Sequence, residues 1–217
     1  MTTTVFIGMC GGVGTTDTAL DHARRSRATI VDMDLVHGAV AHRCGVAASR
    51  TIADLASLAD SDLTADQVAA LVYDTPDLRI IASPGSPELA EIVPASLVGH
   101  LLELLVMRGT VVVDGGSRID TCVLAAMRAA GEVVLIARAD AFCARQVRAT
   151  VQLLERAGVS GCPILVRVPQ SSRRTELSFA AGVGLAVHQP RHRQGGSALA
   201  LPRLVFQRRR GAHAGGH

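Results

Sequence analysis

Short apolar runs alternate along the chain with segments in which apolar residues recur at helical spacing. The runs are continuous, without the polar alternation of a half-exposed strand, and this is typical of strands covered on both faces. The first run, at 5–9, leads directly into a glycine-rich turn. Runs of this kind predict strands at 5–9, 28–32, 78–82, 110–113, 133–137 and 164–168.

The segments between these runs predict helices. The longest of them begins beside Pro94, and proline is well tolerated in the first turn of a helix. Strands that alternate with helices indicate right-handed βαβ units, so we predict a doubly wound α/β fold with a mainly parallel sheet. The predicted helices cover 16–25, 51–58, 65–72, 94–107, 120–130 and 140–157.

The pattern weakens after Pro169, where only a short helix at 176–182 and a last strand at 185–187 are expected. We therefore predict one folded domain at 1–189 and a basic, poorly ordered C-terminal tail at 190–217. From residue 170 onward there are eight arginines against one glutamate, whereas the preceding part has 14 arginines against 18 acids. The stretch 198–210 mixes apolar and basic residues and is interrupted by Pro202, a composition suited to peripheral contact with an anionic membrane.

Composition excludes several classes of function. Aromatic residues make up 2% of the chain, too few for the stacking platform of a single-stranded nucleic-acid binder, and we expect no sequence-specific nucleic-acid partner. The five cysteines form no Cys-x-x-Cys pair, which indicates a reduced, cytoplasmic protein without a zinc site. All 22 basic residues are arginine, so no mechanism can use a lysine of this chain.

A glycine-rich loop lies between the first predicted strand and the first predicted helix. Glycines allow successive N–H groups to point inward, and a helix N-terminus adds positive potential. The hydroxyl of Thr16 is in the position that contacts Mg²⁺ in a phosphate loop. The order of elements therefore predicts a nucleotide-binding loop formed by Gly11, Gly12, Val13, Gly14, Thr15 and Thr16.

Thr15 stands where the ordinary phosphate loop has a lysine. That lysine contacts the β- and γ-phosphates and stabilises the charge that develops during phosphoryl transfer. Its loss leaves the backbone cradle in place and removes a point charge. We therefore expect binding to survive at reduced strength and hydrolysis to be slow or absent.

Three aspartates stand where predicted strands end. Asp32 and Asp34 fall on one side of the second strand end, and Asp114 follows the strand at 110–113. The carboxyl edge of a parallel sheet faces the ligand crevice. We expect Asp114 with Thr16 on the metal side, and Asp32 and Asp34 as catalytic candidates that hold Mg²⁺ through water or orient an attacking water. An acidic loop with a helix cap is the alternative.

These motifs resemble the MinD/ParA-type P-loop family: GGVGTT at 11–16, VDMDLVHG at 31–38 and the strand that ends at Asp114. The stretch 82–88 is also similar, and the closest group is the pilus-assembly and secretion-associated one called CpaE or TadZ, whose loop has threonine in place of lysine. The resemblance follows the element order from about 5 to 168. It implies ATP and Mg²⁺ as cofactors. The family's signature lysine falls at Cys10, so Cys10 and Thr15 together imply a weak ATPase at most.

The resemblance implies a degenerate ATP-binding protein that positions or regulates a pilus or secretion assembly. Its partners would be proteins of that machine and a second copy of the chain, with peripheral contact at the inner face of the membrane. One alternative is a non-catalytic septum-site or cell-division regulator that acts through partners and membrane. A second is a nucleotide-free scaffold. A dinucleotide-binding dehydrogenase fits less well, because the glycine spacing is wrong and Asp34 and Asp114 would have no role.

Overall fold

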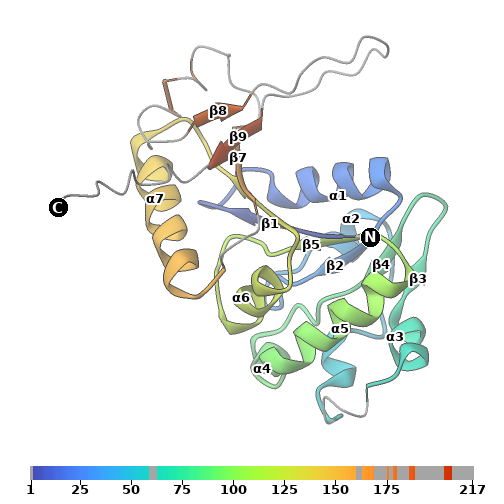
Figure 1. Ribbon diagram of the computed structural model, residues 1–217. Coiled ribbons are helices and arrows are strands. Elements are labelled where there is room, and N and C mark those ends of the chain that lie inside the picture. Colours follow the sequence, from blue (N-terminus) through green and yellow to red (C-terminus); the bar gives the residue numbers. More distant parts are fainter. Residues whose placement is uncertain are drawn as a thin grey trace.

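A nine-stranded sheet with helices on both faces forms the body of the computed structural model (Figure 1). The structure describes residues 2–58, 63–159, 163–168, 175, 178–179, 186–188 and 203–206. The strand order is β3-β4-β2-β5-β1-β6-β7-β9-β8. The strands are β1 (Thr3–Gly8), β2 (Thr29–Asp32), β3 (Tyr73–Asp74), β4 (Arg79–Ile81), β5 (Val111–Asp114), β6 (Glu132–Ile136), β7 (Ile164–Arg167), β8 (Ala186–His188) and β9 (Arg203–Phe206).

The six strands from β4 to β7 pair in parallel, and antiparallel pairing is confined to β3, β9 and β8. Each of the six overlaps a strand predicted from a continuous apolar run, so the mainly parallel, doubly wound fold is confirmed. β1 lies at the centre, between β5 and β6. The carboxyl end of β1 therefore lies between the ends of β5 and β6. Sheets of this kind bind ligands at this edge.

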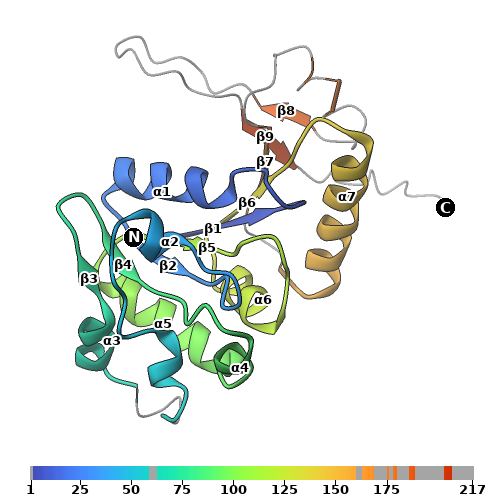
Figure 2. The same ribbon diagram turned by 180° about the vertical axis from the view of Figure 1, so that it is seen from behind.

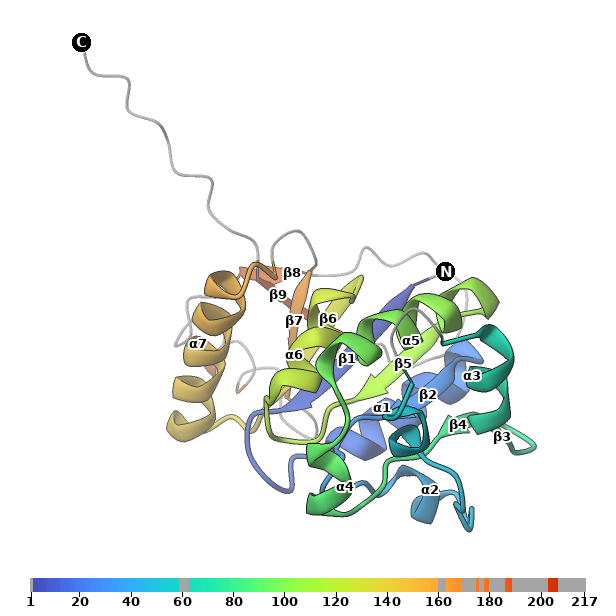
Figure 3. The same ribbon diagram turned by 90° about the horizontal axis from the view of Figure 1, so that it is seen from below.

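The helices form one layer on each face of the sheet. On one face α1 packs Ala19, Leu20 and Ala23 against strand residues such as Phe6 and Ile30. The other face is covered by α3, α5, α6 and α7, and Figures 2 and 3 show these layers from behind and from below. The helices are α1 (Thr15–Ser26), α2 (Val40–Arg43), α3 (Ala65–Leu71), α4 (Pro87–Glu91), α5 (Ala95–Arg108), α6 (Thr121–Arg128) and α7 (Ala141–Arg156).

Aspartate caps fix where two of the helices begin. Asp120 Oδ1 accepts from Val123 N at 2.9 Å before α6, and Asp140 Oδ1 accepts from Cys143 N at 2.7 Å before α7. The helix expected at 51–58 is shorter than predicted. It is a 3₁₀ turn, η1 (Ile52–Leu55), and Thr51 begins it with a capping box.

The C-terminal region contains a strand that the sequence did not predict. β9 lies within the range 190–217 expected to be a poorly ordered tail, and it pairs antiparallel with β7 and β8. The sheet therefore includes the strand at 203–206, which lies beyond residue 189. Residues 204–206 are three consecutive apolar residues of types that favour strands. The prediction missed them because it rested on the average composition of the whole tail, which is basic. The rest of the tail, and most of the helix expected at 176–182, lie outside the described residues.

No helix within the described ranges is both long enough and apolar enough to cross a bilayer.

Candidate nucleotide-binding site

The loop between β1 and α1 has the backbone of a phosphate cradle. Gly12 and Gly14 have φ values of 71° and 81°, in the left-handed region that favours glycine. Gly14 is the N-cap of α1, and its carbonyl oxygen accepts from Thr18 N at 2.9 Å and from Thr18 Oγ1 at 2.7 Å. The loop therefore turns directly into the helix, and the free N–H groups of the first turn of α1 face it.

Close packing holds the start of this loop. A Cβ on Gly8 would lie 2.4 Å from Thr15 Oγ1 and 3.0 Å from Val13 Cγ2, so a side chain cannot be accommodated there without displacing the loop. Gly8 N donates to Gly116 O at 2.7 Å, which ties the end of β1 to the turn that follows β5. The two strand ends thus form one edge of the site.

A cavity of about 180 Å³ opens above this loop. It is smaller than the roughly 300–1,000 Å³ of pockets that enclose a whole drug-sized ligand, so its size suits a phosphate group. The rest of the wall comes from the connection after β2, from α2 and from the turn after β5. The lining residues are Cys10, Gly11, Gly12, Val13, Gly14, Thr15, Thr16, Asp17, Asp34, Arg43, Gly116 and Ser117.

Asp114 is the last residue of β5, is 1% exposed and does not itself line the cavity. Its Oδ1 accepts from Gly116 N at 3.1 Å, and its carboxylate also accepts a hydrogen bond from the Thr16 hydroxyl. Burial raises the pKa of Asp114, while these hydrogen bonds and the nearby charge of Arg43 oppose that rise. The two residues expected on the metal side are therefore in direct contact.

Asp32 is also 1% exposed and does not line the cavity. Its Oδ1 accepts from Asp34 N at 3.2 Å and its Oδ2 accepts from Val40 N at 3.0 Å. Burial, together with the nearby charge of Asp114, raises the pKa of Asp32 to about 7. In this geometry Asp32 holds the connection between β2 and α2, which is the cap role weighed as the alternative for this motif, and a catalytic role for it stays a prediction.

Asp34 reaches the cavity wall. Its Oδ1 accepts from His37 N at 3.0 Å, and the carboxylate packs over Gly116, where a Cβ would lie only 2.3 Å from Asp34 Oδ2. Gly116 has a φ of 61°, a second reason for glycine at this position. Of the two catalytic candidates, Asp34 is the one placed to contact a water or a ligand in the cavity.

Solved structures share this architecture at low sequence identity. A ParA family ATPase from Chlorobium tepidum is 20% identical with a TM-score of 0.72, covering 84% of this chain and 81% of that chain. The septum site-determining protein MinD of Pyrococcus horikoshii, complexed with Mg-ADP, is 17% identical with a TM-score of 0.64, covering 83% and 76%. Cobyrinic acid a,c-diamide synthase of Mycobacterium smegmatis, with bound ADP and magnesium, is 17% identical with a TM-score of 0.66, covering 88% and 86%.

The chain has the fold of the ParA and MinD ATPases. No protein-family model matches the chain, and no curated protein resembles it in sequence. At identities this low, the structural likeness establishes the fold alone. Within this fold, the glycine loop, Thr16, Asp34 and Asp114 come together at the end of β1, and their roles in binding and catalysis stay predictions.

Sequence reasoning missed two charged residues of the cavity wall. Arg43 comes from α2 and forms an ion pair with Asp17, which lies 26 residues earlier in α1. The absence of lysine indicated that any cation must be arginine, but no spacing rule selects Arg43 from 22 arginines. Only the packing of α2 beside the start of α1 brings this cation to the glycine-rich loop.

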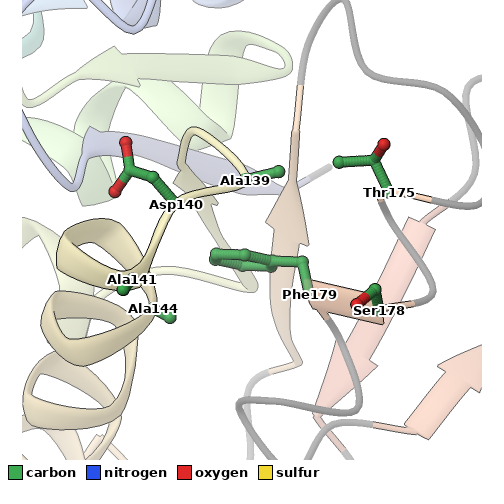
Figure 4. Close-up of a pocket in the computed structure, with 7 residues that line it drawn as sticks. All are labelled: Ala139, Asp140, Ala141, Ala144, Thr175, Ser178 and Phe179. Atoms are coloured by element: carbon green, nitrogen blue, oxygen red, sulfur yellow. The ribbon is translucent and has the colours of Figure 1, made fainter.

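A second recess of about 440 Å³ lies beyond β6, where α7 begins (Figure 4). Figure 4 shows the ring of Phe179 between the α7 side and the segment that carries Thr175 and Ser178. The carboxylate of Asp140 in its wall already caps α7 and pairs with Arg138 at 3.1 Å. A negative charge at that point disfavours phosphate, so the glycine loop is the better anion site in this ParA/MinD fold.

Cys10, at which the sequence resemblance placed the family's signature lysine, is half-buried. The Cys10 side chain hydrogen bonds with Cys143 in α7. Burial and this hydrogen bond raise the pKa of the Cys143 thiol to about 11. The Cys143 thiol therefore stays protonated at neutral pH and packs as a small apolar group. In the described part of the chain, no group of three or more His, Cys, Asp or Glu side chains is arranged to hold a metal ion.

Proposed function

We propose that the protein binds ATP with Mg²⁺ at the loop formed by Gly11, Gly12, Val13, Gly14, Thr15 and Thr16. The observation that carries the proposal is the cavity above this loop, where Thr16 in the cavity wall hydrogen bonds with the buried carboxylate of Asp114. Two proteins with the same fold are described with bound nucleotide and magnesium, MinD of P. horikoshii and the synthase of M. smegmatis.

Each part of the site has a task in this proposal. The loop N–H groups bind phosphate oxygens, and the Thr16 hydroxyl and Asp114 carboxylate are oxygen ligands of the kind Mg²⁺ prefers. When bound, the ion neutralises phosphate charge. Asp34 lies in the cavity wall, where its free carboxylate oxygen can orient a water molecule.

We infer slow turnover or none. Cys10 and Thr15 are uncharged at the two positions where the family has lysines, and this chain has no lysine elsewhere. Removing a fixed charge from a phosphoryl-transfer site lowers the rate of transfer far more than it lowers ground-state binding. The nucleotide then acts as a regulator of conformation or assembly.

We propose that this regulator positions a pilus or secretion assembly, as the resemblance of 11–16, 31–38 and 82–88 to the CpaE/TadZ group suggests. A septum-site or cell-division regulator is the second candidate, favoured by the likeness to MinD. Either role would involve partner proteins, a homodimer and a cytoplasmic location with peripheral membrane contact through the basic tail. Flotation with anionic and neutral vesicles tests the tail, and loss of pili or misplaced septa in a deletion strain separates the two roles.

Equilibrium binding of ATP, with Mg²⁺ and with EDTA, tests the proposed ligand. Thr16→Ala should weaken binding in Mg²⁺ and abolish the difference between Mg²⁺ and EDTA. The matched control is Thr18→Ala, the same change on the same helix at a residue outside the cavity wall, whose amide still donates to the Gly14 carbonyl. No binding by the wild-type protein at millimolar ATP would overturn the proposal and favour a nucleotide-free scaffold.

A further inference from the structure

Arg43 is the one basic side chain among the described residues that line the phosphate cavity. A cavity for phosphate without a cation would rely on backbone N–H groups alone. The lysine that normally supplies this charge is replaced by Thr15, which is 7% exposed and uncharged. Arg43 therefore carries the positive charge that the loop itself lacks.

The fold holds the backbone of Arg43 firmly beside the loop. Val40, at the other end of the short helix α2, is 0% exposed and packs in the core beneath α1. Val40 N donates to the buried Asp32 carboxylate, and Arg43 N donates to Ala39 O at 2.9 Å. The guanidinium is nevertheless about half exposed, with the Arg43 side chain at 47%. The backbone of Arg43 is therefore held in place, while its guanidinium group is free to exchange one hydrogen-bonding partner for another.

Asp17 is the partner of Arg43, and it occupies the first turn of α1. An acidic residue there is favoured by the positive end of the helix, the same potential that attracts a phosphate. The pair is exposed, so it contributes little to stability. Asp17 thus competes with an anionic ligand for both the helix N-terminus and the arginine.

We propose that Arg43 contacts the terminal phosphates of the nucleotide in place of the missing loop lysine, and that Asp17 restrains Arg43 and lowers the affinity for polyphosphate. This inference rests on the proposed function of the glycine loop. A guanidinium binds phosphate oxygens in pairs and keeps its charge at every physiological pH. Because phosphate carries more negative charge than one carboxylate, it can displace Asp17 from Arg43.

The proposal predicts effects of opposite sign at the two members of one ion pair. Arg43→Gln should weaken binding of ATP and of pyrophosphate about tenfold or more, the size expected for a lost charge-assisted contact. Asp17→Asn should strengthen both by about threefold to tenfold, because it removes a competing negative charge. Added salt should shrink both effects, since the site is open to solvent.

A second exposed ion pair, between Arg24 of α1 and Asp77, provides a matched control. Arg24 Nε lies 2.6 Å from Asp77 Oδ2, and the two side chains are 44% and 56% exposed, close to the values for Arg43 and Asp17. Arg24 is in the last turn of α1, so Arg24→Gln and Asp77→Asn change the net charge identically at the opposite end of the helix. Both controls should leave nucleotide and pyrophosphate binding unchanged within about twofold. Circular dichroism melts verify that all four variants are folded.

The measurement is isothermal titration with ATP and with pyrophosphate, both in Mg²⁺. Opposite shifts at Arg43 and Asp17, with none at Arg24 and Asp77, support the proposal. Equal effects at Arg43 and Arg24, or weaker binding by Asp17→Asn, overturn it. If the wild-type protein binds neither probe, the proposed function itself fails. If the wild-type protein binds both and Arg43→Gln binds equally well, only the role of Arg43 is wrong.

Discussion

The phosphate site has a floor of buried residues behind the cavity lining and an exposed rim, and the two contain the same kinds of residue in opposite environments. At the floor, Asp32 and Asp114 are each 1% exposed, and backbone N–H groups satisfy their oxygens. At the rim, Asp17 and Arg43 have side chains 63% and 47% exposed and contact each other. A buried carboxylate that loses its partners costs several kcal/mol, whereas an exposed pair contributes at most about 1 kcal/mol. The floor therefore maintains the fold of the site, and the rim is free to set its affinity.

Truncation of a floor residue should have the largest effect on stability. Asp32→Ala leaves the half-buried amide of Asp34 and the buried amide of Val40 without an acceptor, and we expect a loss of about 2–4 kcal/mol in the free energy of unfolding. Asp17→Ala, the same change at the rim, should cost under about 1 kcal/mol. Urea denaturation at pH 7 measures both. If the two variants lose the same free energy of unfolding, the floor is no more important for stability than the rim, and the distinction between them is wrong.

The floor should also make stability depend on pH. The pKa of Asp32 rises from 3.8 to about 7 on folding, so between these values the folded protein holds a proton that the unfolded chain has released. The free energy of unfolding should therefore fall as the pH rises through this interval and level off above about 7. Asp32→Asn does not titrate, and its stability relative to wild type should improve by about 2 kcal/mol from pH 5 to pH 8.

Urea denaturation in EDTA at several pH values measures this slope. Asp34→Asn tests one cause of the shift, because the charge of Asp34 contributes to raising the pKa of Asp32 and its removal should make the slope shallower. A wild-type protein whose stability rises steadily from pH 5 to pH 8 would contradict the raised pKa of buried Asp32.

Gly116 connects floor and rim, and its substitution should have an intermediate effect. Gly116→Ala places a methyl group where Asp34 Oδ2 lies 2.3 Å away, at a φ of 61°. We expect a loss of about 1–2 kcal/mol from the left-handed backbone, and weaker nucleotide binding because Asp34 must move. Gly85→Ala separates these causes, since Gly85 has a φ of 62° with open space around it. Equal ATP affinity in the two variants would show that Asp34 has no part in binding.

The same contrast separates what sequence predicts well from what it does not. The six central strands were predictable because burial on both faces selects continuous apolar runs. The loop, Thr16, Asp34 and Asp114 were predictable because the ends of parallel strands share one edge. β9 was not, because four residues in a basic segment form a strand only when an edge such as β7 is available. Arg43 was not, because an exposed ion pair between α1 and α2 leaves no periodicity in either segment.

The smallest predicted effect is the loss of ATP affinity that Arg43→Gln causes once a lysine has been placed in the loop. It tests directly whether Arg43 at the rim supplies the charge that the loop lacks. In the Thr15→Lys background, Arg43→Gln should cost about threefold or less in ATP affinity, compared with about tenfold in wild type, because two cations then serve one ligand. Thr15→Met is the control for side-chain length and should leave the full cost of Arg43→Gln in place. If Arg43→Gln lowers ATP affinity about tenfold in both the wild-type and the Thr15→Lys protein, a loop lysine cannot replace Arg43. Arg43 would then contribute to binding in some way other than by supplying the charge that Thr15 lacks.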